Sequence, residues 1–257
     1  MEQHKVVSSE EWLDARIELL TKEKEMTRLR DAISAERRAL PWVRIEKEYV
    51  FDGPEGKVSL ADLFDGRSQL IVKHYMMAPG QTTPCVGCAF EVDHVEGALV
   101  HLRNHDVSYA AVARAPIEEI ETWRRRMGWR FRFVSSFHSD FNYDFNVSFA
   151  PEKAHGGTIY YNYQERQIPM EDLSGRSVFY RNENGEIFHT YSAFGRGTEE
   201  LLTSYVFLDL TPKGRDENGP HHSLADWVRP HDMYGKGGTV EGNGRYHAAD
   251  EASAEST

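Results

Sequence analysis

Cys85 and Cys88 are the only two cysteines in the 257-residue chain, and two residues separate them. Residues 70–77 before them form an apolar run that predicts a buried strand. From Ala89 to Leu102, apolar residues recur at helical spacing. A cysteine at a helix N-terminus is activated because free backbone N–H groups and the helix dipole stabilise its thiolate. The spacing therefore predicts a redox pair in which Cys85 attacks a disulfide and Cys88 resolves the mixed disulfide.

Two other interpretations of the pair stay open from the sequence. A transition-metal ion could be held by Cys85 and Cys88 with His94 as a third ligand, although a structural zinc site normally needs four protein ligands. The thiols could also be unreactive, in a binding module without catalytic activity. We expect no cofactor, with the metal ion as the alternative.

Composition excludes several classes of partner. The net charge of -11 argues against binding to nucleic acid or to an anionic membrane surface. No apolar run is long enough to cross a bilayer, and the first residues begin a polar helix where a signal peptide would have an apolar core. We therefore expect a cytoplasmic protein, and in that compartment two close cysteines are more often catalytic or metal-binding than structural.

The N-terminal segment predicts one long helix. Ser8 and Glu11 have the spacing of a capping box, and the helical pattern continues to about Arg38. A stripe of apolar residues recurs every seven positions, at Trp12, Leu19, Met26 and Ile33. This stripe predicts packing on the rest of the chain or on a second copy, which would give a homodimer.

Strands and helices alternate after the cysteines. Segments 106–113 and 129–134 are predicted strands on either side of a helix at 116–127, an order that implies parallel pairing. Segment 177–191 predicts a hairpin with Asn184-Gly185 in its turn. The polar, acidic residues from about 236 onward are expected to be disordered.

This order is that of thioredoxin, with N-terminal elements of peroxiredoxin type. More closely, the chain resembles a bacterial thioredoxin-like family catalogued as domain of unknown function 899. The matching stretches are Glu36-Arg37-Arg38-Ala39-Leu40-Pro41-Trp42-Val43, residues 63–70, residues 135–137 with 140–144, and residues 208–214. The resemblance covers about Val6 to Tyr234. It implies an α/β, thioredoxin-like fold with a mixed central sheet flanked by helices at 41–212, a helical extension at 1–40 and a C-terminal extension at 213–257.

The resemblance also implies a function and further site residues. We expect a thiol–disulfide oxidoreductase acting on a protein or small-molecule disulfide or thiol. Arg176 corresponds to an arginine of peroxiredoxins, and a guanidinium beside the pair would favour a thiolate. The peroxiredoxin Pro-x-x-x-Thr-x-x-Cys pattern is not met, because counting from Pro79 leads to Val86. A substrate contact is predicted for Pro84 before the pair. The aromatic stretch at 137–149 favours packing over the core, because aromatic side chains mostly bury, and the alternative is a pocket wall in which Phe141 and Tyr143 contact the substrate.

Overall fold

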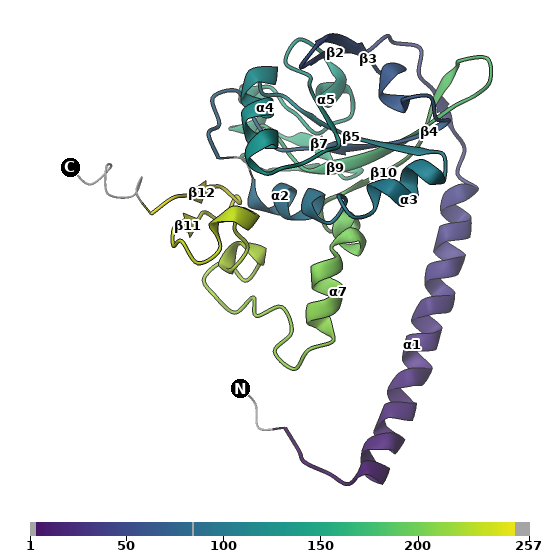
Figure 1. Cartoon of the computed structure of the whole chain (residues 1–257), viewed down its shortest axis with the longest axis vertical. Helices are drawn as coiled ribbons and strands as arrows, with labels where there is room; N and C mark the ends of the chain where they lie inside the picture. Colours follow the sequence, from purple (N-terminus) through teal and green to yellow (C-terminus); the bar gives the residue numbers. More distant parts are fainter. Residues whose placement is uncertain (1–3, 84, 250–257) are drawn as a thin grey trace. The chain divides into compact units, whose positions relative to one another are not determined.

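The computed structural model describes residues 4–83 and 85–249 and divides into two compact units, Met1–Trp42 and Val43–Thr257 (Figure 1). The first unit is the helix α1 (Ser9–Arg38). Its predicted capping box is present, because the Ser8 side chain accepts the Glu11 N–H and the Glu11 side chain accepts the Ser8 N–H. The apolar stripe is exposed along the whole helix, from Trp12 (59%) to Ile33 (44%).

The second unit contains an eight-stranded sheet in the order β1-β10-β9-β4-β5-β6-β2-β3. The strands are β1 (Val43–Arg44), β2 (Val50–Gly53), β3 (Gly56–Ser59), β4 (Gln69–His74), β5 (Val107–Ala113), β6 (Arg132–Ser135), β9 (Gly175–Arg181) and β10 (Ile187–Phe194). β4, β5 and β6 are parallel, as their helical connections predicted, whereas β9 pairs antiparallel with both of its neighbours, β4 and β10. The predicted α/β class with a mixed central sheet, in the thioredoxin order, is therefore confirmed.

Helices cover both faces of the sheet. α2 (Val86–Asp93), α3 (Leu99–Asn104) and α4 (Ile117–Arg126) pack on one face in a core cluster that includes Val92, Ile120 and Phe133. The 3-10 turn η1 (Asp62–Phe64) and α5 (Phe141–Asp144) pack on the other face. The single helical pattern from 89 to 102 is thus two helices, and the turn between them contains Gly97, a residue that disfavours helix.

Smaller elements complete the second unit. They are α6 (Pro151–Ala154), the hairpin of β7 (Ile159–Tyr161) and β8 (Gln164–Arg166), η2 (Gly195–Leu201) and α7 (Thr203–Asp209). No helix in the described part of the chain is long and apolar enough to cross a membrane.

The C-terminal extension packs against α2, where Figure 1 shows its β11 and β12 labels. It contains η3 (Leu224–Asp226), η4 (His231–Met233) and a hairpin of β11 (Thr239–Val240) and β12 (Tyr246–His247). The disorder expected from about 236 is therefore wrong as far as residue 249, and the residues beyond lie outside the described part. Val240 and Tyr246 are buried in the same apolar cluster as Val86 and Phe90 of α2, and this burial stabilises a segment that is polar by composition.

Candidate active site

The two cysteines lie where β4 passes into α2, as the sequence predicted. Cys85 is the N-cap of α2, half-buried, and backbone N–H groups of Gly87 and Cys88 face its sulfur. Cys88, one turn into the helix, is only 2% exposed. Its Sγ accepts the backbone N–H of Met76, at 3.5 Å. Cys85 is therefore the more exposed of the two cysteines.

A buried ion pair lies beside the sulfurs, between the sheet and α2. Lys73 of β4 is fully buried, and its Nζ is 2.5 Å from Oε2 of Glu91 on α2 and 2.6 Å from Oγ of Ser174. Thr198 donates its hydroxyl to the same Glu91 oxygen, at 3.4 Å. A lysine inside a strand is tolerated here because its charge is paired and hydrogen-bonded.

The two cysteines ionise as a coupled pair. The Cys85 thiol donates a hydrogen bond to Cys88, which is the main cause that lowers the pKa of Cys88 to about 7, against the cost of burial; the nearby Lys73 charge and the Met76 N–H add to it. The same hydrogen bond, together with burial, raises the pKa of Cys85. One thiolate therefore forms near neutral pH, and the loss of a second proton is strongly opposed.

The C-terminal hairpin forms one wall of the site. Gly244, in the turn between β11 and β12, accepts the Val86 N–H through its carbonyl oxygen, at 2.9 Å. A Cβ built on Gly244 would lie 3.1 Å from the Cys85 sulfur, and the residue has a φ of +86°. Only glycine fits this left-handed conformation and close approach without strain.

A cavity of about 600 Å³ opens beside Cys85. The loop before the cysteines lines it with Met76, Pro79 and Gln81, and the hairpin contributes Arg245. The remaining wall contains the apolar residues Pro169 and Met170 and the polar side chains of Arg114, His155, Glu171 and Asp172. This volume is in the range of small-molecule sites, so the reactive sulfur has room for a ligand.

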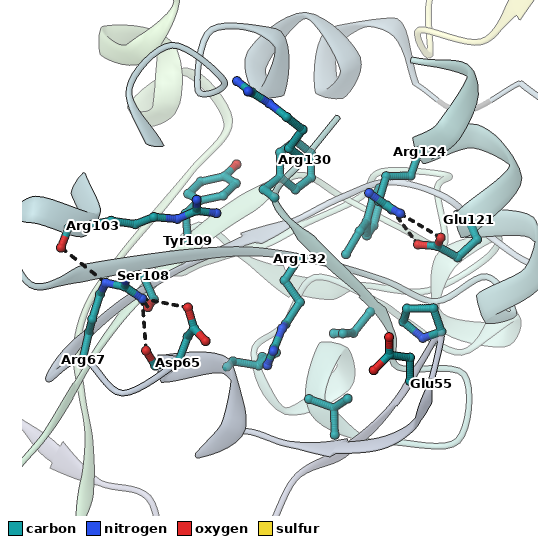
Figure 2. A pocket seen from close by; sticks show the side chains of 16 residues that line it. Glu55, Asp65, Arg67, Arg103, Ser108, Tyr109, Glu121, Arg124, Arg130 and Arg132 are labelled. Carbon is teal, nitrogen blue, oxygen red and sulfur yellow. Dashed lines mark hydrogen bonds and ion pairs between the residues drawn. The ribbon is translucent and has the colours of Figure 1, made fainter. Parts of the chain in front are cut away.

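A second cavity, of about 370 Å³, lies at the end of the parallel strands opposite to the cysteines (Figure 2). It lies near the first residues of the parallel strands β5 and β6, whereas the cysteines follow the end of β4. Two ion pairs lie within its lining: Arg67 is 2.8 Å from Asp65, and Arg124 is 2.6 Å from Glu121. We assign no chemistry to it.

The structure separates the other residues predicted for the site. Arg176 is buried behind the ion pair, where it donates to the Thr198 carbonyl at 3.1 Å and lies 4.0 Å from Glu91. Phe141 is fully buried in the core cluster on the other face of the sheet, which contradicts its predicted substrate contact. Tyr143 is 41% exposed and touches Arg114 at 3.5 Å, so its contact with substrate stays a prediction. Pro84 lies outside the described residues.

His94 does not join the cysteines. It is the C-cap of α2, a helix of eight residues whose length of about 12 Å separates it from the N-cap Cys85. Its Nδ1 donates to the Phe90 carbonyl at 2.6 Å, and its Nε2 accepts from Ser204. No group of three or more His, Cys, Asp or Glu side chains in the described residues is arranged to hold a metal ion. In the described residues, His94 therefore does not lie with Cys85 and Cys88 as a third ligand.

Sequence comparison decides the family. The family described as "Bacterial protein of unknown function (DUF899)" matches residues 1–234. The chain belongs to this family. The resemblance found in the sequence is thus confirmed, and both cysteines lie inside the matched residues, whereas the β11–β12 hairpin lies beyond them. A comparison with curated protein sequences found no match.

Similar solved structures include several peroxiredoxins. Peroxidoxin BcpB from Mycobacterium tuberculosis is 11% identical over 64% of this chain and 95% of its own, with a TM-score of 0.44. Peroxiredoxin Q from Xanthomonas campestris is 12% identical over 65% of this chain and 96% of its own, with a TM-score of 0.42. The mitochondrial 2-Cys peroxiredoxin from Plasmodium falciparum is 14% identical over 66% and 94%, with a TM-score of 0.38. These are likenesses at low identity, and they assign no activity to this chain.

Sequence reasoning missed Lys73, Gly244 and Arg245. A signal for the first was present, because a lysine interrupts the apolar run of a strand predicted to be buried, and such a charge needs a buried partner. No local signal pointed to the other two, since they reach the site only through the path of the C-terminal chain.

Proposed function

We propose that this protein is a thiol–disulfide oxidoreductase. One observation carries the proposal: the accessible sulfur of Cys85 hydrogen-bonds a buried Cys88 whose pKa is lowered to about 7. The cavity of about 600 Å³ gives a substrate access to Cys85, and the Cys88 thiolate that forms near neutral pH can accept the Cys85 proton as Cys85 attacks, which is what disulfide exchange needs. A reducing compartment such as the cytoplasm would keep the pair as thiols between turnovers.

The first step forms a mixed disulfide at Cys85. As its sulfur attacks one sulfur of a substrate R–S–S–R, its proton passes along the existing hydrogen bond to the Cys88 thiolate. The new bond joins Cys85 Sγ to R–S, the S–S bond of the substrate breaks, and R–S⁻ leaves. Access assigns the attack to Cys85, because Cys88 is only 2% exposed.

The second step closes the ring between the two cysteines. Cys88 gives its proton to the departing thiolate or to water and then, as a thiolate, attacks Cys85 Sγ. The bond between Cys85 and R–S breaks, and a second R–S⁻ is released. Two electrons have moved from the protein dithiol to the substrate, which leaves as two thiols, and an external dithiol restores the protein. The backbone N–H groups of Gly87 and Cys88 stabilise charge on the Cys85 sulfur in both steps.

Cysteine variants test this proposal. Cys85→Ser is expected to abolish the reduction of 2-hydroxyethyl disulfide with dithiothreitol as reductant. Cys88→Ser is expected to stop after the first step and to accumulate a mixed disulfide on Cys85, visible as one added R–S group in the intact mass. Full turnover by either variant would refute a two-cysteine mechanism.

A further inference from the structure

The β11–β12 hairpin fixes the position of Arg245 beside the reactive sulfur. The preceding residue, Gly244, bonds the first N–H of α2 and lies against the Cys85 sulfur. Tyr246, which follows, is 1% exposed and donates its hydroxyl to the Gly237 carbonyl at 3.0 Å. With both neighbours held, the exposed Arg245 side chain lines the same cavity as Cys85.

The other charged groups of this cavity are already paired. Arg114 donates to both oxygens of Asp172, at 2.8 and 3.0 Å, and to Glu171 at 3.0 Å. The second oxygen of Glu171 faces His155 at 3.1 Å. One guanidinium is thus shared by two carboxylates, and the imidazole of His155 hydrogen-bonds one of them.

Arg245 differs from these residues. Within the described part of the chain, its guanidinium makes no hydrogen bond or ion pair; only its backbone is bonded, and its charge acts on Glu241 from a distance. The cavity therefore offers one unsatisfied cation next to a nucleophilic sulfur.

We propose that the substrate of Cys85 is a small disulfide that carries a carboxylate, and that Arg245 binds this carboxylate. The inference rests on the proposed function and adds the class of substrate. A guanidinium matches a carboxylate with two parallel hydrogen bonds, which orients the ligand as well as attracting it. Because Arg245 and Cys85 line one cavity, a ligand held there by its carboxylate has its disulfide in the same space as the attacking sulfur.

Three disulfides of matched size test the proposal. 3,3′-Dithiodipropionate, 2-hydroxyethyl disulfide and cystamine carry carboxylate, hydroxyl and ammonium groups on the same two-carbon arms. The wild-type protein is expected to reduce them in that order of kcat/KM. Arg245→Gln is expected to lower the preference for the dicarboxylate over the hydroxyl compound about tenfold, as for loss of a partly exposed charge-assisted hydrogen bond. Arg30→Gln, on the exposed surface of α1, is the matched control and should leave the preference unchanged.

Alkylation gives a second measurement that needs no turnover. Iodoacetate and iodoacetamide differ by a carboxylate, and the ratio of their rates at Cys85 reports the attraction of that group. The ratio is expected to be higher in the folded wild-type protein than in the urea-unfolded chain, and to fall in Arg245→Gln but not in Arg30→Gln.

The outcomes separate the two proposals. If no disulfide is reduced but the alkylation ratio depends on Arg245, the redox function fails and the anion site stands. If the wild-type protein reduces 2-hydroxyethyl disulfide with the same kcat/KM as the dicarboxylate, the role of Arg245 is refuted and the redox function stands. The same conclusion follows if Arg245→Gln slows all three disulfides equally and leaves the alkylation ratio unchanged.

Discussion

Replacing Lys73 by methionine tests the buried charge beside the two sulfurs. The Lys73 and Glu91 side chains are 0% and 7% exposed and their charged atoms are 2.5 Å apart, so the variant leaves a buried carboxylate without its main partner. Breaking such a pair costs about 3–5 kcal/mol. The Arg176 guanidinium, 4.0 Å from the other oxygen of Glu91, remains, and we therefore expect the lower end of that range. Urea unfolding measures this loss.

The same substitution is expected to raise the pKa of Cys88 above its value of about 7. Lys73 helps to lower that pKa and Glu91 raises it, so removing the cation alone shifts the balance in one direction. The rate of alkylation of Cys85 below pH 8 should fall accordingly, because Cys85 gives its proton to the Cys88 thiolate as it reacts and fewer molecules would contain that thiolate.

Two further variants make the Lys73 prediction specific. Lys57→Met breaks an ion pair with Asp52 in which the lysine is 62% exposed, and should cost at most about 1 kcal/mol. Lys73→Met combined with Glu91→Gln removes both charges and should recover most of the lost free energy of unfolding. If Lys73→Met costs no more than Lys57→Met, or leaves the pKa of Cys88 unchanged, the ion pair does not support the site as we describe.

Two other predictions concern the hairpin and the N-terminal helix. Gly244→Ala should displace the hairpin, free the Val86 N–H and speed the reaction of Cys85 with iodoacetamide, because a Cβ at this position lies 3.1 Å from the sulfur. Gly185→Ala, also at positive φ but with nothing within 4 Å of the new Cβ, is the control for backbone strain; equal alkylation rates in the two variants would refute a covering role for the hairpin. We also predict that the exposed stripe of α1 joins two copies of the chain, so that Met26→Glu lowers the mass measured by light scattering from dimer to monomer; a wild-type monomer would contradict this.

Local sequence patterns were sufficient to predict much of the fold. The parallel order of β4, β5 and β6 followed from apolar strands separated by helical segments, since such connections leave little choice of topology. The β9–β10 hairpin followed from Asn184-Gly185, and Gly185 has the positive φ, 83°, that such a turn requires. The position of Cys85 at the N-terminus of α2 could be predicted because the spacing of apolar residues changes near that residue from the strand period to the helix period.

The parts of the site that were missed depend on contacts between distant segments. Lys73 is stabilised by Glu91 on a different element, and periodicity alone cannot pair them. The C-terminal hairpin is short and polar, and it is ordered because Val240 and Tyr246 find an apolar surface on α2. The predicted substrate contact of Phe141 is wrong because aromatic side chains mostly bury, and Phe141 lies in the core cluster, as the favoured interpretation of the aromatic stretch had it.

The most direct test of the account is a titration of thiolate absorbance in the reduced protein. The two cysteines share one proton, so one thiolate per molecule should appear near pH 7 and the second only well above the ordinary value of 9.0. In Cys85→Ser, where a hydroxyl replaces the thiol donor, the remaining thiolate should appear at a higher pH than the first thiolate of the wild type. Two thiolates that titrate together near the ordinary value would contradict the shared proton and the function built on it.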